Sequence, residues 1–81
     1  MSDTAENQQS VDQIVAVIDR GPGRQIQVRL NEFKGKRYVD LRQFYLDEEQ
    51  EVYKPTQKGV SIPVEQFGEL KEALAKLEPL L

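Results

Sequence analysis

Apolar and polar residues alternate with a period of two along most of this chain, and only the C-terminal part follows a helical period. Residues 14–19, IVAVID, are a short apolar run rich in β-branched residues, which predicts a well-buried strand. Residues 24–32 place Ile26, Val28 and Leu30 toward one face and polar side chains toward the other, the pattern of a strand covered on one side. A Gly-Pro-Gly turn separates the two strands.

The third predicted strand, residues 36–46, does not keep one regular alternation. Val39 and Leu41 occupy odd positions, whereas Phe44 and Leu46 occupy even ones. A regular strand would turn one of these pairs toward water, because successive side chains point to opposite faces. We therefore expect a β-bulge in this strand that absorbs one extra residue.

The predicted bulge, near Arg42 and Gln43, decides which side chains share the open face of the sheet. Phe44 belongs to the core, and Arg42 and Tyr45 lie side by side. Asp40 is expected to pair with neighbouring cations. The open face then carries Lys36, Tyr38, Asp40 and Arg42 before the bulge and Tyr45 after it.

The hairpin before this strand contains Gly35, which supplies the positive φ of a tight turn. Phe33 stands at the shoulder of that hairpin, and the pattern leaves open whether its ring faces the core or the solvent. Residues 51–62 predict a last strand, interrupted near Pro55-Thr56, with Gly59 at a bulge or a close approach of two strands.

The C-terminal residues 63–78 predict a helix, because apolar side chains recur at steps of three and four. This stripe consists of Val64, Phe67, Leu70, Leu74, Leu77 and Leu81. The polar residues 1–11 predict a disordered leader, and residues 12–81 a single domain. The fold class is α+β, a four-stranded curved antiparallel sheet followed by one helix. One helix covers only part of one face of such a sheet, and a chain of 81 residues without cysteine has little else to stabilise it. A homodimer is therefore expected.

Charge is distributed unevenly along the chain, although the net charge is −3. Residues 20–46 hold seven Lys and Arg against two acidic residues, a local sum of +5, and the remaining segments are acidic. Screening confines the effect of charge to about 8–10 Å, so a polyanion at short range responds to this local excess. The two readings are a solvated sheet face and a surface that binds a polyanion.

The composition argues against catalysis. Histidine and cysteine are absent, and with them the most common general base, metal ligand and thiol nucleophile. We expect no enzyme activity, no cofactor, no metal and no small-molecule substrate. The sequence has no apolar stretch of about 20 residues, so we expect no membrane partner. A cytoplasmic, nucleoid-associated protein is expected, or a nuclear one in a eukaryote.

Cations beside exposed aromatic rings are what single-stranded nucleic acid requires, since phosphates pair with Lys and Arg while bases stack on rings. The hairpin and the third strand supply this combination in Phe33, Lys34, Lys36, Arg42 and Tyr45.

Five short motifs in order carry a resemblance to a known family. They are FKGK at 33–36, DLRQFY at 40–45, KP at 54–55, KGVSI at 58–62 and EQF at 65–67. Together they resemble the single-stranded-DNA-binding domain of the positive cofactor four family of transcriptional coactivators, over roughly residues 24–75. The predicted leader, residues 1–11, is not the long Ser-rich acidic tail of eukaryotic members, so a compact, prokaryotic-like member is expected.

The resemblance implies a whirly-like homodimer whose two curved sheets form paired basic channels for single-stranded DNA or unwound duplex, with little sequence preference. It implies stacking by Phe33 and Tyr45, and phosphate contacts by Arg24, Lys34, Lys36, Arg42 and Lys58. The family usually has Trp where Tyr45 stands. The cellular role would lie in transcription, replication or repair. RNA binding, and a protein-interaction module that docks an acidic segment of the transcription machinery, remain alternatives.

Overall fold

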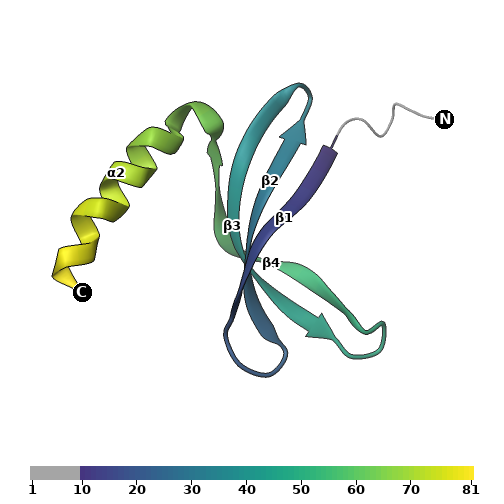
Figure 1. Ribbon diagram of the computed structural model, residues 1–81. Coiled ribbons are helices and arrows are strands. Elements are labelled where there is room, and N and C mark those ends of the chain that lie inside the picture. Colours follow the sequence, from purple (N-terminus) through teal and green to yellow (C-terminus); the bar gives the residue numbers. More distant parts are fainter. Residues whose placement is uncertain (1–9) are drawn as a thin grey trace.

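The computed structural model describes residues 10–81, and it consists of four strands followed by one helix with short 3₁₀ turns at both of its ends. Figure 1 shows the strands as a strongly twisted sheet from which the helix extends away. The elements are β1 (Ser10–Asp19), β2 (Arg24–Phe33), β3 (Lys36–Asp47), β4 (Val52–Pro63), η1 (Val64–Gln66), α2 (Phe67–Leu77) and η2 (Glu78–Leu80).

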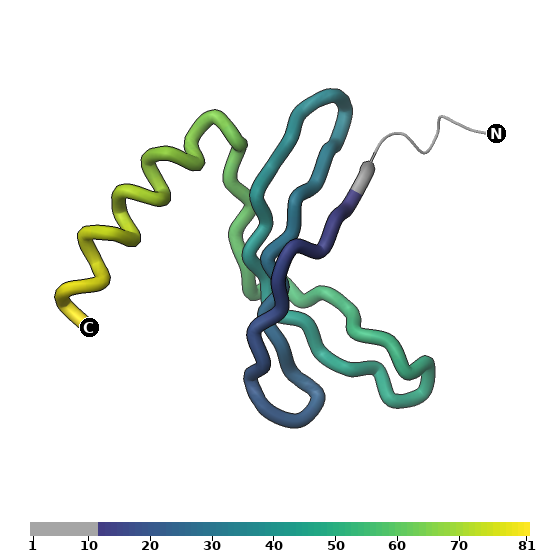
Figure 2. Tube along the Cα trace, in the orientation of Figure 1, coloured from purple at the N-terminus to yellow at the C-terminus, as the bar shows by residue number. Residues whose placement is uncertain are grey.

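The sheet is an antiparallel meander in the order β1-β2-β3-β4. Its order and the single C-terminal helix confirm the predicted architecture. The prediction of a well-buried first strand is wrong for the single chain, because Ile14 and Val15 in β1 are 54% and 61% exposed. The β2–β3 turn lies at one end of the sheet, and the β1–β2 and β3–β4 turns diverge at the other, as the trace in Figure 2 makes clear. This divergence follows from the right-handed twist that antiparallel ribbons accumulate.

Two boundaries differ from the prediction by more than one residue. The first strand begins at Ser10 rather than at residue 14, so the last two residues of the predicted leader pair with β2; the rest of that leader, residues 1–9, lies outside the described residues. The helix proper begins at Phe67, because Pro63 is still paired in β4 and residues 64–66 form a 3₁₀ turn.

The two faces of the sheet differ in polarity over residues 25–31 of β2 and the parts of β3 and β4 that pair with them. One face carries the even-numbered residues of β2 with their partners in β3 and β4, because cross-strand partners share a face. We call it the apolar face, and it is formed by Ile26, Val28, Leu30, Val39, Leu41, Val60 and Ile62. The opposite, polar face carries Gln25, Gln27, Arg29, Asn31, Asp40 and Arg42.

Phe44 is the one buried apolar residue within the described chain, at 4% exposure, which confirms its predicted place in the core. It lies on the polar face in register between Gln25 and Pro55. The Arg29 guanidinium carbon lies 5.2 Å from the centroid of its ring, a cation–π distance. Arg29 also donates to the Asp12 carboxylate at 2.9 Å.

The predicted irregularity is present, but it lies in β4 and not in β3. The β2–β3 ladder runs without a shift from Phe33↔Lys36 to Arg24↔Tyr45. Between the pairs Arg42↔Gly59 and Phe44↔Pro55, β3 has one residue and β4 has three. We call residues 56–58 the β4 bulge. This agrees with the predicted interruption near Pro55-Thr56, and it corrects the prediction of an extra residue in β3.

Gly59 marks a close approach of two strands, as predicted. A Cβ atom at this position would lie 2.7 Å from the Leu41 carbonyl oxygen and 2.8 Å from both Cα and Cβ of Arg42. Real Cβ atoms do not come this close to other heavy atoms, and glycine is therefore required where β4 returns to β3 after the bulge.

The helix makes few contacts with its own sheet. Its apolar side chains are open to solvent, with exposed fractions of 43% for Phe67 and 52% for Leu74. The radius of gyration is 15.0 Å, whereas a compact chain of this length would have about 12 Å. A single chain thus leaves much of its apolar surface uncovered.

Candidate nucleic-acid interface

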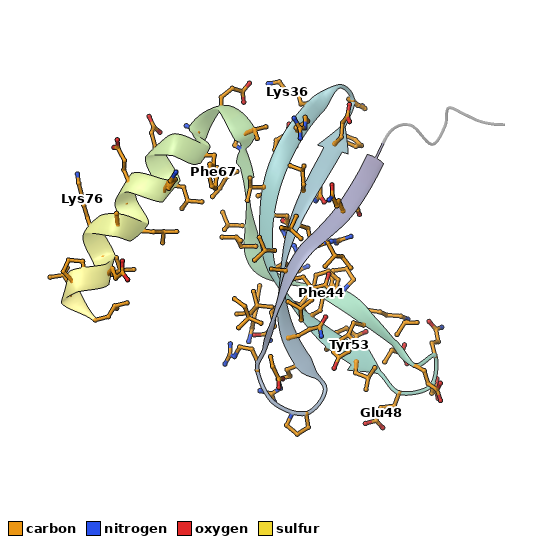
Figure 3. The ribbon with its side chains drawn as sticks, in the orientation of Figure 1. Lys36, Phe44, Glu48, Tyr53, Phe67 and Lys76 are labelled. Carbon is orange, nitrogen blue, oxygen red and sulfur yellow. The ribbon has the colours of Figure 1, made fainter. Side chains whose placement is uncertain are left out.

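The tip of the β2–β3 hairpin presents one exposed ring between two cations. Lys34 and Gly35 form a two-residue turn with φ of 54° and 81°, which closes the pair Phe33↔Lys36. The ring of Phe33 is 47% exposed, and the Lys34 ammonium lies 5.3 Å from its centroid. Lys36 stands at the tip in Figure 3. The structure thus places Phe33 at the surface, the position that the sequence left open.

A second ring lies at the opposite end of the same two strands. Tyr45 is 44% exposed, and Arg24 and Lys54 are its partners on the neighbouring strands. Lys54 is engaged by Asp47, whose carboxylate lies 2.8 Å from its ammonium. The hydrogen bond from Lys54 lowers the pKa of Asp47, and the same contact raises the pKa of Lys54. Arg24 is therefore the cation next to Tyr45 that remains open to a ligand.

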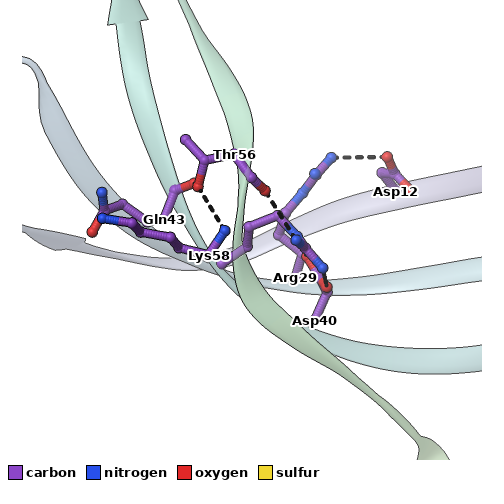
Figure 4. Close-up of polar contacts among 7 residues, drawn as sticks. Asp12, Arg29, Asp40, Gln43, Thr56 and Lys58 are labelled. Atoms are coloured by element: carbon purple, nitrogen blue, oxygen red, sulfur yellow. Dashed lines mark hydrogen bonds and ion pairs between the residues drawn. The ribbon is translucent and has the colours of Figure 1, made fainter.

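Arg42 is held by contacts within the chain. Its Nε and Nη2 atoms donate to the two carboxylate oxygens of Asp40 at 3.1 and 3.0 Å, and Nη1 donates to the Thr56 carbonyl at 2.9 Å. Figure 4 shows this cluster. Asp40 is 3% exposed, so the predicted ion-pair role of Asp40 is confirmed. The hydrogen bond to Asp40 raises the pKa of Arg42 above its usual value.

The predicted juxtaposition of Arg42 and Tyr45 on one face is wrong. Because the β2–β3 ladder is unbroken, Arg42 lies on the polar face with Asp40 and Phe44, and Tyr45 points to the other side of β3. The physical reason is that β4, and not β3, absorbs the extra residues.

Lys58 lies in the β4 bulge, beside Gln43. Its side chain lines an open depression of about 200 Å³ together with Gln43, Ile26 and Leu41. Gln43 also accepts a hydrogen bond from Arg20 at 3.3 Å. Lys58 lies opposite Gln43, and Gln43 is only two positions before Tyr45 on the same side of β3. Lys58 therefore belongs to the same end of the sheet as Tyr45.

The seven predicted site residues thus form two groups rather than one. The tip set is Phe33, Lys34 and Lys36, and the far set is Arg24, Tyr45 and Lys58; Arg42 lies between them. Tyr45 lies nine residue steps after Lys36 in β3, which corresponds to about 30 Å along a strand. In the part of the chain that the structure describes, the cations of both sets form no ion pair.

Thr56 is the residue that sequence reasoning missed. Its hydroxyl donates to the Gln43 carbonyl at 2.8 Å and accepts from the Lys58 backbone N–H at 3.1 Å. The only sequence signal was the interruption between Pro55 and Gly59, which indicates a break in pairing and does not show what closes it.

Residues 10–81 contain neither a cluster of metal ligands nor a helix suited to span a membrane. No group of three or more acidic, His or Cys side chains could hold a metal ion there. Among the helices of this segment, none combines the length and the apolarity that a membrane span needs.

Comparison with solved structures places the fold. A PC4 homologue from Burkholderia pseudomallei superposes with a TM-score of 0.75 at 24% identity, covering 84% of this chain and 98% of the other. The bacteriophage T5 homologue of the eukaryotic transcription coactivator PC4, implicated in recombination-dependent DNA replication, gives 0.69 at 28% identity, covering 82% and 75%.

Sequence comparison leads to the same group. A Caenorhabditis elegans protein whose name assigns it to the RNA polymerase II transcriptional coactivators is 33% identical over 49 residues, which are 60% of this chain and 40% of that protein. The family model for Transcriptional Coactivator p15 (PC4) matches residues 21–73, more than half of the chain. The protein therefore belongs to the PC4 family of transcriptional coactivators.

Proposed function

We propose that this protein binds single-stranded DNA as a homodimer, with little sequence preference. The observation that carries the proposal is the pairing of exposed rings with unpaired cations at both ends of the β2–β3 hairpin. Phe33 has Lys34 and Lys36 beside it, and Tyr45 has Arg24. Rings stack on bases while cations neutralise phosphates, and each stack contributes about 1–3 kcal/mol.

Single strands suit this surface better than duplexes, because a ring can stack only on a base that has left its own stack. Stacking and phosphate contacts do not read base edges, which is the physical basis for the low sequence preference. Arg24, Lys34, Lys36 and Lys58 are the phosphate ligands in this proposal. Arg42 enters only through the guanidinium N–H groups that Asp40 and Thr56 leave unused.

DNA is the first choice of nucleic acid because the phage T5 relative is implicated in DNA replication and the nematode relative is named as a transcriptional coactivator. A role at exposed single strands during transcription, replication or repair follows, with a location at the nucleoid or, in a eukaryote, the nucleus. RNA and unwound duplex are alternative ligands that the experiment below compares.

The homodimer is supported by the apolar surface that one chain leaves open. Val60 on the apolar face is 49% exposed, and Leu74 and Leu77 on the helix are 52% and 45% exposed. A second copy related by a two-fold axis would cover equivalent surfaces in both chains at once. It would also bring four rings, each with its neighbouring cations, into one particle.

Fluorescence anisotropy with a labelled oligonucleotide tests the proposal, with the matching duplex and an RNA of the same sequence as comparisons. Four phosphate contacts per chain predict that log affinity for the single strand falls with log salt with a slope of about −2.8. Equal affinity for duplex, or an affinity that hardly responds to salt, would rule the proposal out. Partners recovered from a nuclease-treated lysate at high salt, without single-strand binding, would instead support the protein-interaction module.

A further inference from the structure

The β4 bulge has a defined internal structure, and one side chain organises it. Three residues of β4, Thr56, Gln57 and Lys58, lie opposite the single residue Gln43 of β3. Residues opposite a bulge lose their regular ladder partners. The Gln43 carbonyl and the Lys58 N–H are two groups left in this way, and both are satisfied by the Thr56 hydroxyl, at 2.8 and 3.1 Å.

The backbone of Thr56 is fixed as well. Its carbonyl accepts from Arg42 Nη1 at 2.9 Å, and Arg42 is in turn held by the buried carboxylate of Asp40. Arg42 also lines the open depression at the bulge, together with Gln43 and Lys58. Thr56 thus joins the Asp40–Arg42 pair to the backbone of Gln43 and Lys58, and Figure 4 shows Thr56 beside these two residues.

We propose that Thr56 is a positioning residue: its hydroxyl holds the β4 bulge in the conformation that keeps the Lys58 ammonium at the end of the sheet where Arg24 and Tyr45 lie, and there Lys58 serves as a phosphate ligand. This inference rests on the proposed single-strand binding. Thr56 itself needs no contact with DNA. The Thr56 hydroxyl accepts directly from the Lys58 backbone N–H, two positions along the chain, so losing this hydrogen bond would free the backbone that carries the cation.

The first test uses the protein without DNA. Thr56→Val keeps the shape of the side chain and removes the hydroxyl, and Thr56→Ser keeps the hydroxyl. We expect the Lys58 amide to exchange its hydrogen about 2- to 12-fold faster in Thr56→Val, the range for loss of one hydrogen bond, and at nearly the wild-type rate in Thr56→Ser. Unchanged exchange in Thr56→Val would overturn the inference whether or not DNA binds.

The second test is a double-mutant cycle on single-strand affinity. Thr56→Val and Lys58→Ala are each expected to make the salt slope shallower by about 0.7, one phosphate contact, and the double variant should lose no more than Lys58→Ala alone. Thr56→Ser should restore binding. Gln57→Ala is the control, because this exposed neighbour makes no side-chain hydrogen bond or ion pair in the described chain and should bind as the wild type does.

The outcomes separate the inference from the function on which it rests. If Lys58→Ala weakens salt-dependent binding and Thr56→Val does not, the function stands and the positioning role is wrong. If the two substitutions weaken binding additively, Thr56 acts on the fold in general and the inference also fails. If the wild-type protein shows no preference for the single strand, the proposed function fails, and the positioning of a phosphate ligand fails with it.

Discussion

Gly59→Ala and Gly68→Ala make the same chemical change in this protein, and the structure predicts effects of opposite sign. At residue 59 the added methyl would lie 2.7 Å from the Leu41 carbonyl oxygen and 2.8 Å from Cα and Cβ of Arg42. These atoms belong to the backbone or are attached directly to it, so no flexible side chain can move aside. The strands β3 and β4 must separate instead.

The magnitude follows from the cost of overpacking. Forcing a methyl group into a filled site costs about 1–3 kcal/mol, and a clash with backbone atoms belongs at the upper end of that range. For a domain of this size each kcal/mol lowers the melting temperature by roughly 4–8 °C. We therefore expect Gly59→Ala to lower the free energy of unfolding by about 2–3 kcal/mol and the melting temperature by roughly 8–24 °C.

The control is Gly68 in the first turn of α2, where an added Cβ would meet nothing within 4 Å. Residues 68, 71, 72 and 75 share one face of the helix, away from the apolar stripe. Alanine is favoured over glycine in helices by up to about 1 kcal/mol, so Gly68→Ala should raise the stability slightly.

Thermal unfolding followed by circular dichroism measures both variants, at one protomer concentration because a dimer gains apparent stability with concentration. A Gly59→Ala protein within about 0.5 kcal/mol of the wild type would refute the reasoning, since β4 could not then pass so close to β3.

Three further predictions concern binding, pH and assembly. Tyr45→Ala should weaken single-strand affinity by about 5- to 150-fold at an unchanged salt slope, because it removes a stacking ring. Lys36→Ala should make the salt slope shallower by about 0.7, because it removes one phosphate contact. Anisotropy titrations over a salt series measure both, and an equal change of slope in the two variants would contradict this assignment. The pKa of Asp47 is lowered, so its ion pair with Lys54 stabilises the fold at pH values above the unfolded pKa of 3.8 and loses this effect as the pH falls through the folded pKa. An NMR titration should show the Asp47 pKa rising in Lys54→Met. No rise would show that the pair does not form in solution. Leu74→Glu should shift the protein toward monomer in sedimentation velocity at micromolar concentration, and an unchanged species would place the dimer contact elsewhere.

Local patterns predicted most of the fold correctly. The alternation in residues 24–32 identified strand β2, and the three-to-four spacing after Pro63 identified the helix. Both were correct because the side-chain period depends only on local backbone geometry. The turn at Gly35 was equally local, since it depends on a positive φ. Phe44 was correctly assigned to the core, but for a reason that the pattern did not contain.

The misplaced bulge shows where local reasoning stops. The switch from Val39 and Leu41 to Phe44 and Leu46 suggested that β3 changes face. In the structure β3 alternates regularly, and Phe44 is buried on the polar face beneath the Arg29 guanidinium, which stands on another strand. A sequence pattern assumes one covered face, whereas this sheet buries apolar side chains on both faces at different positions along the strand.

The sequence by itself determined the element types, their order, and the cations and rings available for binding. Only the tertiary structure decided the register of β4 against β3, the separation of those residues into a tip set and a far set, and the engagement of Arg42 by Asp40 and Thr56. The physical reason is that strand pairing and side-chain contacts join residues far apart in the chain, so their free energies depend on geometry that no short stretch of sequence encodes.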